Sequence, residues 1–476
     1  MRALVLLHRW LGVAFCLLFA MWFASGMVMH FVPFPALSEA ERVAGLTSFD
    51  PASVARTPRD ALIRLGGPDV QRLRLAAPAG DPVYIGTRQD STISALDARS
   101  GKKLIVDGAY ALASARAHAR ASGIEEARAA LVATEAHDQW SVPNGFDAHR
   151  PLHRIALDND AGTVLYVSSV TGEVVLDTHR FERVWNWAGS ILHWIYPTIL
   201  RKHWAAWDST VWWLSLAAMI GALTGTALGV LRLNARRSPF RGWMRWHHIL
   251  GLSCALFVLT WIFSGWLSMD HGLLFSNGKP SADERGRIHG PALAAASIAE
   301  WADIQTPFRE MEWFGFAGQT GMRVIDATGA RRLRIGTQDS AWLSAAQVNN
   351  AARLLGSLCT RVTVIPADDA YAARSVAADA PVYRIACGET WFHIDGANGR
   401  VIEKLDSSRR AYRWAYQALH TLDFPGLAQR QMLRRTLIVV LCMGGLAFSL
   451  TGAVIGWRRL KRSIRRRPAL RYTQVP

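Results

Sequence analysis

Four long apolar stretches that contain no Asp, Glu, Lys or Arg divide the chain. They cover residues 10–38, 209–231, 246–269 and 436–457. A helix needs about 20 apolar residues to cross the hydrocarbon core of a bilayer, so each stretch is long enough. We therefore predict a membrane protein with four transmembrane helices and the lipid bilayer as its surroundings. The first stretch, with its basic start, also fits a cleaved signal peptide, but the third stretch repeats it in mid-chain.

Polar and apolar residues alternate, as they do in β-strands, in the two polar regions between these helices, residues 39–208 and 270–435. Each contains a strand, a turn and a strand, at residues 163–177 (TVLYVSSVTGEVVLD) and 390–404 (TWFHIDGANGRVIEK). Thr171-Gly172 and Asn398-Gly399 are typical of hairpin turns, because glycine accepts a positive φ. Residues 82–93 and 111–120 indicate further strands and a helix. We expect two small α+β domains.

The basic residues lie next to the apolar stretches. The 476 residues include 54 Lys and Arg against 37 Asp and Glu, a net charge of +17. The excess is concentrated at Arg2 and Arg9, in residues 232–245 and in residues 458–476, where no acidic residue occurs. This placement favours a membrane surface over a nucleic-acid partner, and the positive-inside rule puts both termini and the 232–245 loop in the cytoplasm. The two α+β domains then face outward.

The chain contains an internal duplication. Five residues near the start of the first and third helices match at a constant offset of 239: His8, Leu11, Gly12, Ser25 and Gly26 with His247, Leu250, Gly251, Ser264 and Gly265. Nine further residues match at an offset of 227: Thr163, Gly172, Arg183, Trp187, Ala188, His193, Thr224, Gly225 and Gly229 with Thr390, Gly399, Arg410, Trp414, Ala415, His420, Thr451, Gly452 and Gly456. In both halves the predicted order is a helix, an outer domain and a second helix. We therefore expect a pseudo-two-fold axis along the membrane normal.

These motifs together resemble the PepSY-associated transmembrane family. The resemblance rests on HRWLG at residues 8–12, on the hairpin with Tyr166, Val167, Thr171, Gly172 and Glu173, and on the pairs Leu192-His193 and Leu419-His420. It covers nearly the whole chain. Members of the family often continue Leu-His with Thr-Gly-Glu, whereas this chain continues with Trp194-Ile195 and Thr421-Leu422.

The resemblance implies a fold and a setting. The fold class is a membrane α-helical protein with two extracytoplasmic α+β PepSY-like domains, located in the bacterial inner membrane with the domains in the periplasm. The expected divisions are a first transmembrane helix (1–38), a first domain (39–180), an interfacial helix with the second transmembrane helix (181–231) and a cytoplasmic loop (232–245). The third helix (246–269), a second domain (270–407), an interfacial helix with the fourth transmembrane helix (408–457) and a basic tail (458–476) follow.

Several histidines border the predicted bilayer. His8, His247 and His248 lie on the inner side, and His30, His193, His271 and His420 lie on the outer side. Neutral imidazole is a good axial ligand of haem iron, and a b-type haem needs no CxxCH motif, which this chain lacks. His8 and His30 are 22 residues apart on one helix, about 33 Å, so they cannot serve one haem. We therefore expect two haems b, one near each face.

The preferred pairs follow from the duplication. His8 and His247 are equivalent on the inner side, with His248 as the fallback, and His193 and His420 are equivalent on the outer side. The sequence leaves open whether His193 and His420 share one iron or pair with His30 and His271. It also leaves open an interfacial role, which is ordinary for an amphipathic ring at a helix end. The stripe Gly221, Gly225 and Gly229 fits close helix packing or room for a flat porphyrin.

Two haems at opposite faces predict transmembrane electron transfer. The family resemblance implies a ferric-chelate reductase of iron acquisition, with a ferric siderophore as the typical acceptor. No dinucleotide-binding GxGxxG motif, P-loop or HExxH is present, so a separate donor is expected, either quinol or a cytoplasmic flavoprotein. The alternatives are a non-redox scaffold or regulator that binds periplasmic proteins and a transport component for iron or a siderophore. Cys359 and Cys387 are candidates for a disulfide in an oxidising periplasm.

Overall fold

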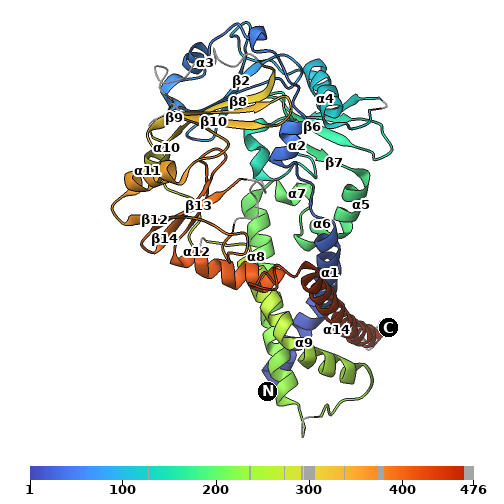
Figure 1. The fold of residues 1–476 in the computed structure, drawn as a ribbon. Coiled ribbons are helices and arrows are strands. Elements are labelled where there is room, and N and C mark those ends of the chain that lie inside the picture. Colours follow the sequence, from blue (N-terminus) through green and yellow to red (C-terminus); the bar gives the residue numbers. More distant parts are fainter. Residues whose placement is uncertain are drawn as a thin grey trace, which may run out of the picture. The chain divides into compact units, whose positions relative to one another are not determined.

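The computed structural model divides the chain into two compact units (Figure 1). It describes residues 1–126, 128–234, 237–272, 274–290, 293, 306–336, 338–372 and 380–465. The helical unit comprises residues 1–34, 184–275 and 411–476, and the β-rich unit comprises residues 35–183 and 276–410. The predicted basic tail lies outside the described residues from position 466 onward.

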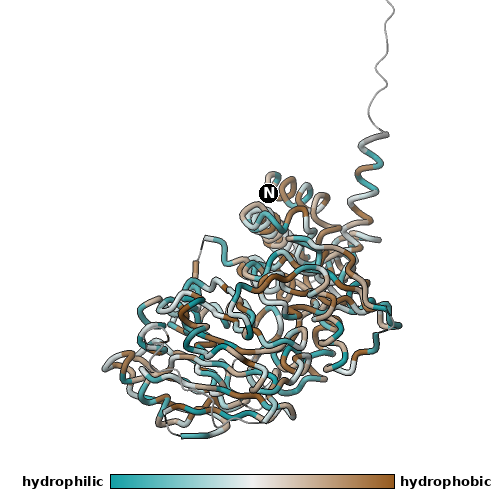
Figure 2. Tube along the Cα trace, turned by 90° about the horizontal axis from the view of Figure 1, so that it is seen from above, coloured by the Kyte–Doolittle hydropathy of each residue, from teal (hydrophilic) through white to brown (hydrophobic). Residues whose placement is uncertain are grey.

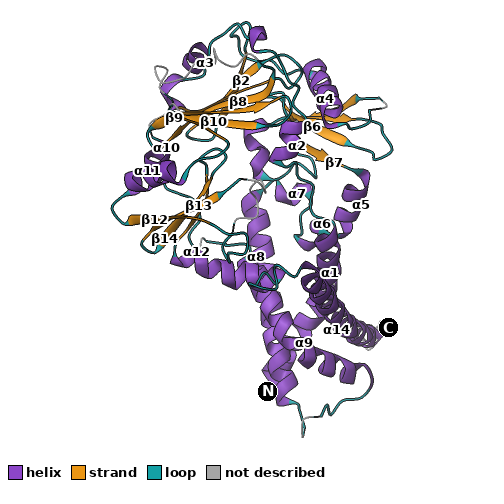
Figure 3. Ribbon diagram, viewed as in Figure 1, coloured by secondary structure: helices purple, strands orange, loops and turns teal. Residues whose placement is uncertain are grey.

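Four helices of the helical unit are long and apolar enough to cross a membrane, as predicted (Figure 3). They are α1 (Arg2–Phe31), α8 (Trp204–Leu231), α9 (Gly242–Leu267) and α14 (Gln431–Arg465). Helix α1 packs against α8 and α14, and α9 packs against the same two helices. The first helix ends at Phe31 rather than at residue 38, because Val32 precedes Pro33 and adopts an extended conformation.

Short helices precede α8 and α14, where interfacial helices were predicted. Those before α8 are α5 (Arg180–Ala188), α6 (Ser190–His193) and α7 (Thr198–Arg201). Those before α14 are α12 (Ser407–Tyr412), a π-helix (Arg413–Ala418) and α13 (Leu419–Thr421). The π-helix was not predicted. Such segments are rare and often mark functional sites, and this one leads directly into His420.

The centre of the β-rich unit is an antiparallel sheet of seven strands in the order β11-β10-β9-β8-β1-β2-β3. Its strands are β1 (Val70–Ala76), β2 (Val83–Arg88), β3 (Ile93–Asp97), β8 (Phe308–Phe316), β9 (Gln319–Asp326), β10 (Arg331–Ile335) and β11 (Gln338–Ser340). Strands β1 and β8 pair with each other, so the regions expected as two separate domains contribute to one sheet.

Buried ion pairs explain why β1 and β8 meet. Arg74 on β1 lies opposite Glu312 on β8 and forms an ion pair with Glu310 (2.9 Å), while Arg72 forms one with Glu312 (2.7 Å). Arg323 on β9 contacts both glutamates at 2.9 Å, and both carboxylates are fully buried. A buried charge is tolerated only when it is paired, so these strands are bound to each other by charge as well as by main-chain hydrogen bonds.

A four-stranded antiparallel sheet with a helix completes each half of the β-rich unit. The first consists of β4 (Ala130–Glu135), β5 (Leu152–Ala156), β6 (Val164–Ser168) and β7 (Val174–Thr178) with α4 (Gly108–Ser122). The second consists of β12 (Cys359–Val364), β13 (Val382–Cys387), β14 (Thr390–Asp395) and β15 (Val401–Leu405) with α11 (Ala345–Leu355). The shorter helices of this unit are α2 (Glu39–Ala44), α3 (Pro58–Arg64) and α10 (Ala282–His289).

Both predicted hairpins are present. They join β6 to β7 and β14 to β15, and Gly172 and Gly399 adopt φ values of +71° and +70° at the two turns. A residue with a Cβ atom is strained at such angles, which explains the glycine at both turns. Figure 2 shows hydrophobic (brown) and hydrophilic (teal) segments close to each other along the trace of the chain.

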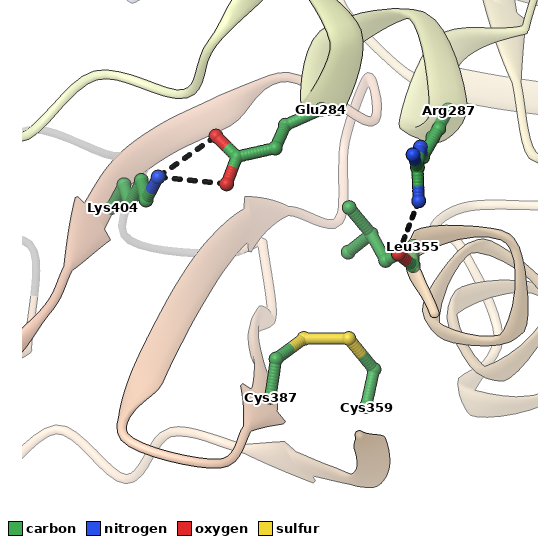
Figure 4. Close-up of a disulfide and its surroundings, with 6 residues drawn as sticks. All are labelled: Glu284, Arg287, Leu355, Cys359, Cys387 and Lys404. Atoms are coloured by element: carbon green, nitrogen blue, oxygen red, sulfur yellow. Dashed lines mark hydrogen bonds and ion pairs between the residues drawn. A yellow bond between two sulfur atoms is a disulfide. The ribbon is translucent and has the colours of Figure 1, made fainter. Parts of the chain in front are cut away.

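A disulfide joins Cys359 and Cys387, the pair proposed from the sequence (Figure 4). The two residues lie directly opposite each other on β12 and β13. Nearby, Lys404 of β15 binds Glu284 of α10 at 2.7 Å, and Arg287 of α10 donates to the carbonyl of Leu355. The bridge therefore joins two strands of the second four-stranded sheet, and the polar contacts attach α10 to β15 and to α11.

Candidate cofactor site: two histidine pairs

The helical unit brings His8 and His247 together. His8 is on α1 and His247 is on α9, and their ring centres are 6.4 Å apart with an interplanar angle of 33°. The phenyl ring of Phe448 on α14 stacks on His247 at 4.9 Å. This first pair is the one that the constant offset in the sequence favoured.

His193 and His420 form a second pair. Their ring centres are 6.2 Å apart, with an interplanar angle of 61°. His193 ends α6 and is held against α1, because the indole of Trp22 donates to its carbonyl oxygen at 3.0 Å. Burial lowers the pKa of both imidazoles to about 4, and the neighbouring His420 contributes to the lowered pKa of His193. Both rings are therefore neutral at pH 7.

Hydrogen bonds fix the tautomer of both histidines in the first pair. Nδ1 of His8 lies 3.1 Å from the carbonyl oxygen of Gly221, which can only accept, so Nδ1 carries the proton. Nδ1 of His247 lies 3.0 Å from the hydroxyl of Thr451, which donates its own proton to the carbonyl of Phe448. Since a hydroxyl has one proton, Thr451 accepts from His247. In both rings Nε2 keeps its lone pair.

The same logic applies to the second pair. Nδ1 of His193 lies 3.2 Å from the hydroxyl of Ser25, and Nδ1 of His420 lies 3.1 Å from the hydroxyl of Ser264. Each serine donates its proton to a main-chain carbonyl of its own helix, at 2.6 and 3.1 Å. Each hydroxyl therefore accepts from the imidazole. All four histidines thus have Nδ1 protonated and Nε2 ready to bind a metal ion, the usual arrangement for a metal-binding histidine.

Each imidazole also lies against a glycine of a spanning helix. A Cβ atom added at that glycine would lie 2.5 to 3.4 Å from Cε1 of the ring. The four contacts are Gly225 with His8 (2.5 Å), Gly452 with His247 (3.4 Å), Gly26 with His193 (3.3 Å) and Gly265 with His420 (3.3 Å). Glycine at these positions lets a ring approach the helix backbone closely, so part of the predicted glycine stripe makes room for the histidines.

A cavity of about 380 Å³ lies beside the first pair, between α1, α8, α9 and α14. His8 and His247 both line it, together with seven glycines: Gly12, Gly221, Gly225, Gly229, Gly251, Gly452 and Gly456. Three arginines also line it: Arg9, Arg232 and Arg459. The volume is within the usual range for small-molecule and cofactor sites, which are mostly apolar with a few polar groups.

The separation of the two rings in each pair is compatible with one metal ion that both imidazoles would hold. Two imidazoles that bind one ion from opposite sides at about 2.0–2.1 Å have ring centres roughly 6 Å apart. The observed separations are 6.4 and 6.2 Å. Among the described residues no group of three or more His, Cys, Asp or Glu could hold a bare metal ion. A pair of ligands suits haem, whose macrocycle supplies the remaining donors.

The two pairs are separated by similar lengths of helix. On α1, Gly26, which contacts His193, is 18 positions after His8. On α9, Gly265, which contacts His420, is also 18 positions after His247. Eighteen helical residues span about 27 Å. This is close to the thickness of the hydrocarbon core, about 30 Å.

The remaining predicted histidines lie outside both pairs. His248 binds Ser238 through Nδ1 (2.9 Å) and the carbonyl of Gly229 through Nε2 (2.8 Å), so both of its ring nitrogens have hydrogen-bond partners. His271 binds Asp208 and stacks on Trp212 at 5.0 Å.

His30 lies beside Phe31, and its Nε2 is buried with no hydrogen-bond partner among the described residues. Among the outer histidines, the ring of His193 lies next to that of His420, with ring centres 6.2 Å apart.

Sequence reasoning missed the residues that orient the imidazoles. Ser25, Ser264 and Thr451 were identified only as matched positions of the duplication, with no role toward the histidines. Their signal was present, because Ser25 and Ser264 match at the offset of 239 and each precedes a matched glycine. The arginines of the cavity were assigned only to membrane orientation.

A family model described as "PepSY-associated TM region" matches residues 5–459. This range includes both histidine pairs, the β-rich unit and all but the outermost residues of α1 and α14. No curated protein and no solved structure matches the chain.

Proposed function

We propose, from the premise that this chain belongs to the family of the PepSY-associated TM region, that it is a membrane oxidoreductase that holds two b-type haems. Family membership and the four apolar helices identify a membrane protein. The haems, the electron transfer and the acceptor are the proposal. The observation that carries it is that two histidine pairs, each with both Nε2 lone pairs available, are separated by 18 residues along α1 and α9.

The proposed ligands are His8 with His247 and His193 with His420. Haem, when bound, supplies an iron that takes up and releases one electron at a time. The chain holds the imidazoles through Gly221, Thr451, Ser25 and Ser264. These outer hydrogen bonds orient a ligand and raise its basicity, which favours metal binding.

Aromatic side chains fill the space between the two pairs. Phe23 of α1 packs against Phe257 and Trp261 of α9, with ring centres 6.1 and 6.2 Å apart, and Phe257 and Trp261 are 5.6 Å apart. Helix α14 accommodates them, since a Cβ at Gly445 would lie 2.6 Å from the ring of Phe23. This packing keeps charged carriers out of the region between the pairs, so only electrons are expected to pass.

The proposed orientation follows from the basic residues. Arg2 and Arg9, the 232–245 loop and the end of α14 favour the cytoplasm for the side of the first pair. The second pair and the β-rich unit then face the periplasm of a bacterial inner membrane. The Cys359–Cys387 disulfide supports this, since disulfides persist in oxidising compartments. The equivalent contacts of the two pairs, at offsets of 239 and 227, support an internal duplication.

The proposed acceptor is a ferric siderophore or another ferric chelate, as the family resemblance implies. One electron converts the ferric ion to the ferrous ion, which hard oxygen ligands bind more weakly, and the chelator is left unchanged. The donor is a quinol or a cytoplasmic flavoprotein on the side of the first pair.

The test is the haem content of the purified chain. We expect two haems per chain, a Soret band and an α-band in the reduced-minus-oxidised spectrum. His8→Ala and His193→Ala should each lose one haem, whereas His203→Ala, a change at an exposed residue, should lose none. A chain that remains free of haem when isolated from haem-replete cells would overturn the proposal.

The acceptor is tested separately. Anaerobically reduced protein should be reoxidised by a ferric siderophore, with the ferrous ion trapped by a ferrous-specific chelator in a ratio of one ion per haem oxidised. A haem-containing protein that no ferric chelate reoxidises would retain the cofactor assignment and refute the substrate.

A further inference from the structure

The cavity beside the first pair carries positive charge at its wall. Arg9 on α1, Arg232 at the end of α8 and Arg459 on α14 line it, and no Asp or Glu is among the described residues that do so. Most of the other lining side chains are apolar or glycine. An otherwise apolar cavity with three guanidinium groups and no carboxylate is complementary to a flat, apolar molecule that bears anionic groups.

The three arginines come from three different helices but from the same end of the bundle. Arg9 directly follows His8, Arg232 directly follows α8, and Arg459 lies eight residues beyond Thr451, which binds His247. Eight helical residues span about 12 Å. Arg232 and Arg459 therefore lie beyond the histidines, on the side away from the second pair, and Arg9 lies next to His8 in sequence.

We propose that Arg9, Arg232 and Arg459 bind the two carboxylates of the macrocycle held by His8 and His247, and so orient it with its carboxylate edge toward the basic end of the helices. This inference rests on the proposed function. Arginine suits the role because it stays charged and presents a planar fork that binds a carboxylate through two hydrogen bonds. The arginines thereby select an anionic porphyrin over a neutral molecule of similar size, such as a quinone.

Neighbouring arginines provide a matched control. Arg458 precedes Arg459 but lies over the ring of Trp243 at 5.9 Å rather than on the cavity wall, and Arg2 and Arg245 also lie off the wall. The test variant is R9Q/R232Q/R459Q, and the control is R2Q/R245Q/R458Q. Both lose three positive charges near the same membrane face, so an effect on insertion or topology appears in both.

The experiment measures the rate at which the full-length haem-loaded chain, in a neutral detergent, transfers haem to excess apomyoglobin. Both triple variants also carry His193→Ala, so that only the first pair is observed. We expect R9Q/R232Q/R459Q to lose haem roughly tenfold faster than the control, since two charge-assisted contacts are removed. R9K/R232K/R459K should restore most of the slow rate. A chain without arginine substitutions, once its haem has been removed, should rebind haemin but not haemin dimethyl ester.

Each outcome decides one claim. Equal transfer rates for the test and control variants, or equal rebinding of haemin and its dimethyl ester, would overturn the role of the arginines while the haem assignment stands. A chain without arginine substitutions that carries no haem at the first pair would overturn the proposed function itself. If R9Q/R232Q/R459Q is isolated without haem, rebinding by the R459Q single variant, compared with R458Q, replaces the transfer assay.

Discussion

Gly225 on α8 and the imidazole of His8 on α1 are in such close contact that a methyl group at residue 225 would lie 2.5 Å from Cε1 of the ring. The equivalent contact of the other half, Gly452 with His247, leaves 3.4 Å, which is an ordinary van der Waals distance. The two halves therefore make the same glycine–histidine contact, but a methyl group fits at residue 452 and not at residue 225.

Gly225→Ala should displace the ring of His8 and abolish haem binding at the first pair, although every proposed ligand is still present. Gly452→Ala should keep the haem. We expect a haem content of about one per chain for G225A and about two for G452A and for the wild type, measured from the Soret absorbance and the protein concentration.

Gly12→Ala is the matched control for this experiment. Gly12 lines the same cavity, but a Cβ there meets nothing within 4 Å. If G12A loses as much haem as G225A, helix packing rather than the position of His8 explains the loss.

The serine hydroxyls that accept hydrogen bonds from the second histidine pair should increase the affinity for haem. Ser25→Ala and Ser264→Ala each remove a hydroxyl that accepts from Nδ1 and leave the ligand in place. Loss of such a hydrogen bond typically costs 10–100-fold in metal affinity, so we expect roughly tenfold faster haem loss from the second pair. Transfer to apomyoglobin in a chain that also carries His8→Ala measures it.

Ser215→Ala provides the comparison for the serine variants. Ser215 is also a buried serine on a spanning helix, but it does not contact either histidine pair in the described structure. If a general packing defect causes the effect, S215A should lose haem as fast as S25A. A midpoint potential that shifts for S25A and S264A but not for S215A supports the role in orienting the ligand.

The sequence predicted the histidine pairs better than it predicted the outer fold. His8 and His247 match at one constant offset, and His193 and His420 match at another. The internal duplication was therefore sufficient to predict which histidines lie next to each other. Helix periodicity and length were sufficient for the four spanning helices, because a bilayer imposes both.

The shared sheet could not be predicted in the same way. Arg72 and Glu312 are 240 residues apart, and neither the alternation in β1 nor that in β8 identifies the partner strand. The hydrogen bonds of His248 to Ser238 and to the carbonyl of Gly229 also depend on tertiary structure and have no signal in the local sequence pattern. Local patterns report which face of an element is buried, but they do not report what covers it.

Glu173 should make the β-rich unit sensitive to acid. Burial raises the pKa of this carboxyl, but Arg74 and Arg42 outweigh burial and lower the pKa to about 2. A lowered folded-state pKa stabilises the fold above the ordinary value of 4.5, and this stabilisation is lost as the pH falls from 4.5 toward 2. The shift corresponds to about 3 kcal/mol. Thermal unfolding between pH 7 and pH 3 should show the loss.

Glu173→Gln should remove that part of the pH dependence and destabilise the unit at pH 7 by about 3–5 kcal/mol, because Arg74 and Arg42 lose a buried partner. Arg400→Gln is the comparison, since Arg400 follows the equivalent turn glycine and binds Glu312 from a half-exposed position. Arg400→Gln should lower the free energy of unfolding by about 1 kcal/mol or less. An E173Q chain as acid-sensitive as the wild type would contradict this role of Glu173.

The Cys359–Cys387 bridge links stability to the compartment. It closes a loop between residues 28 apart in sequence, so C359S/C387S should lower the free energy of unfolding by about 3–4 kcal/mol. The wild type should unfold at a correspondingly lower temperature in dithiothreitol, while C359S/C387S should not respond.

The same bridge tests the proposed orientation. Cys16, Cys254 and Cys442 are free and lie on α1, α9 and α14. Chain that is acid-quenched in whole cells, denatured and alkylated without reduction should therefore gain three labels by mass, and C254S should gain two. Because a cytoplasmic thiol pool keeps cysteines reduced, a β-rich unit on the cytoplasmic side would give five labels. Five labels would reverse the orientation and, with it, the direction in which electrons reach a ferric chelate.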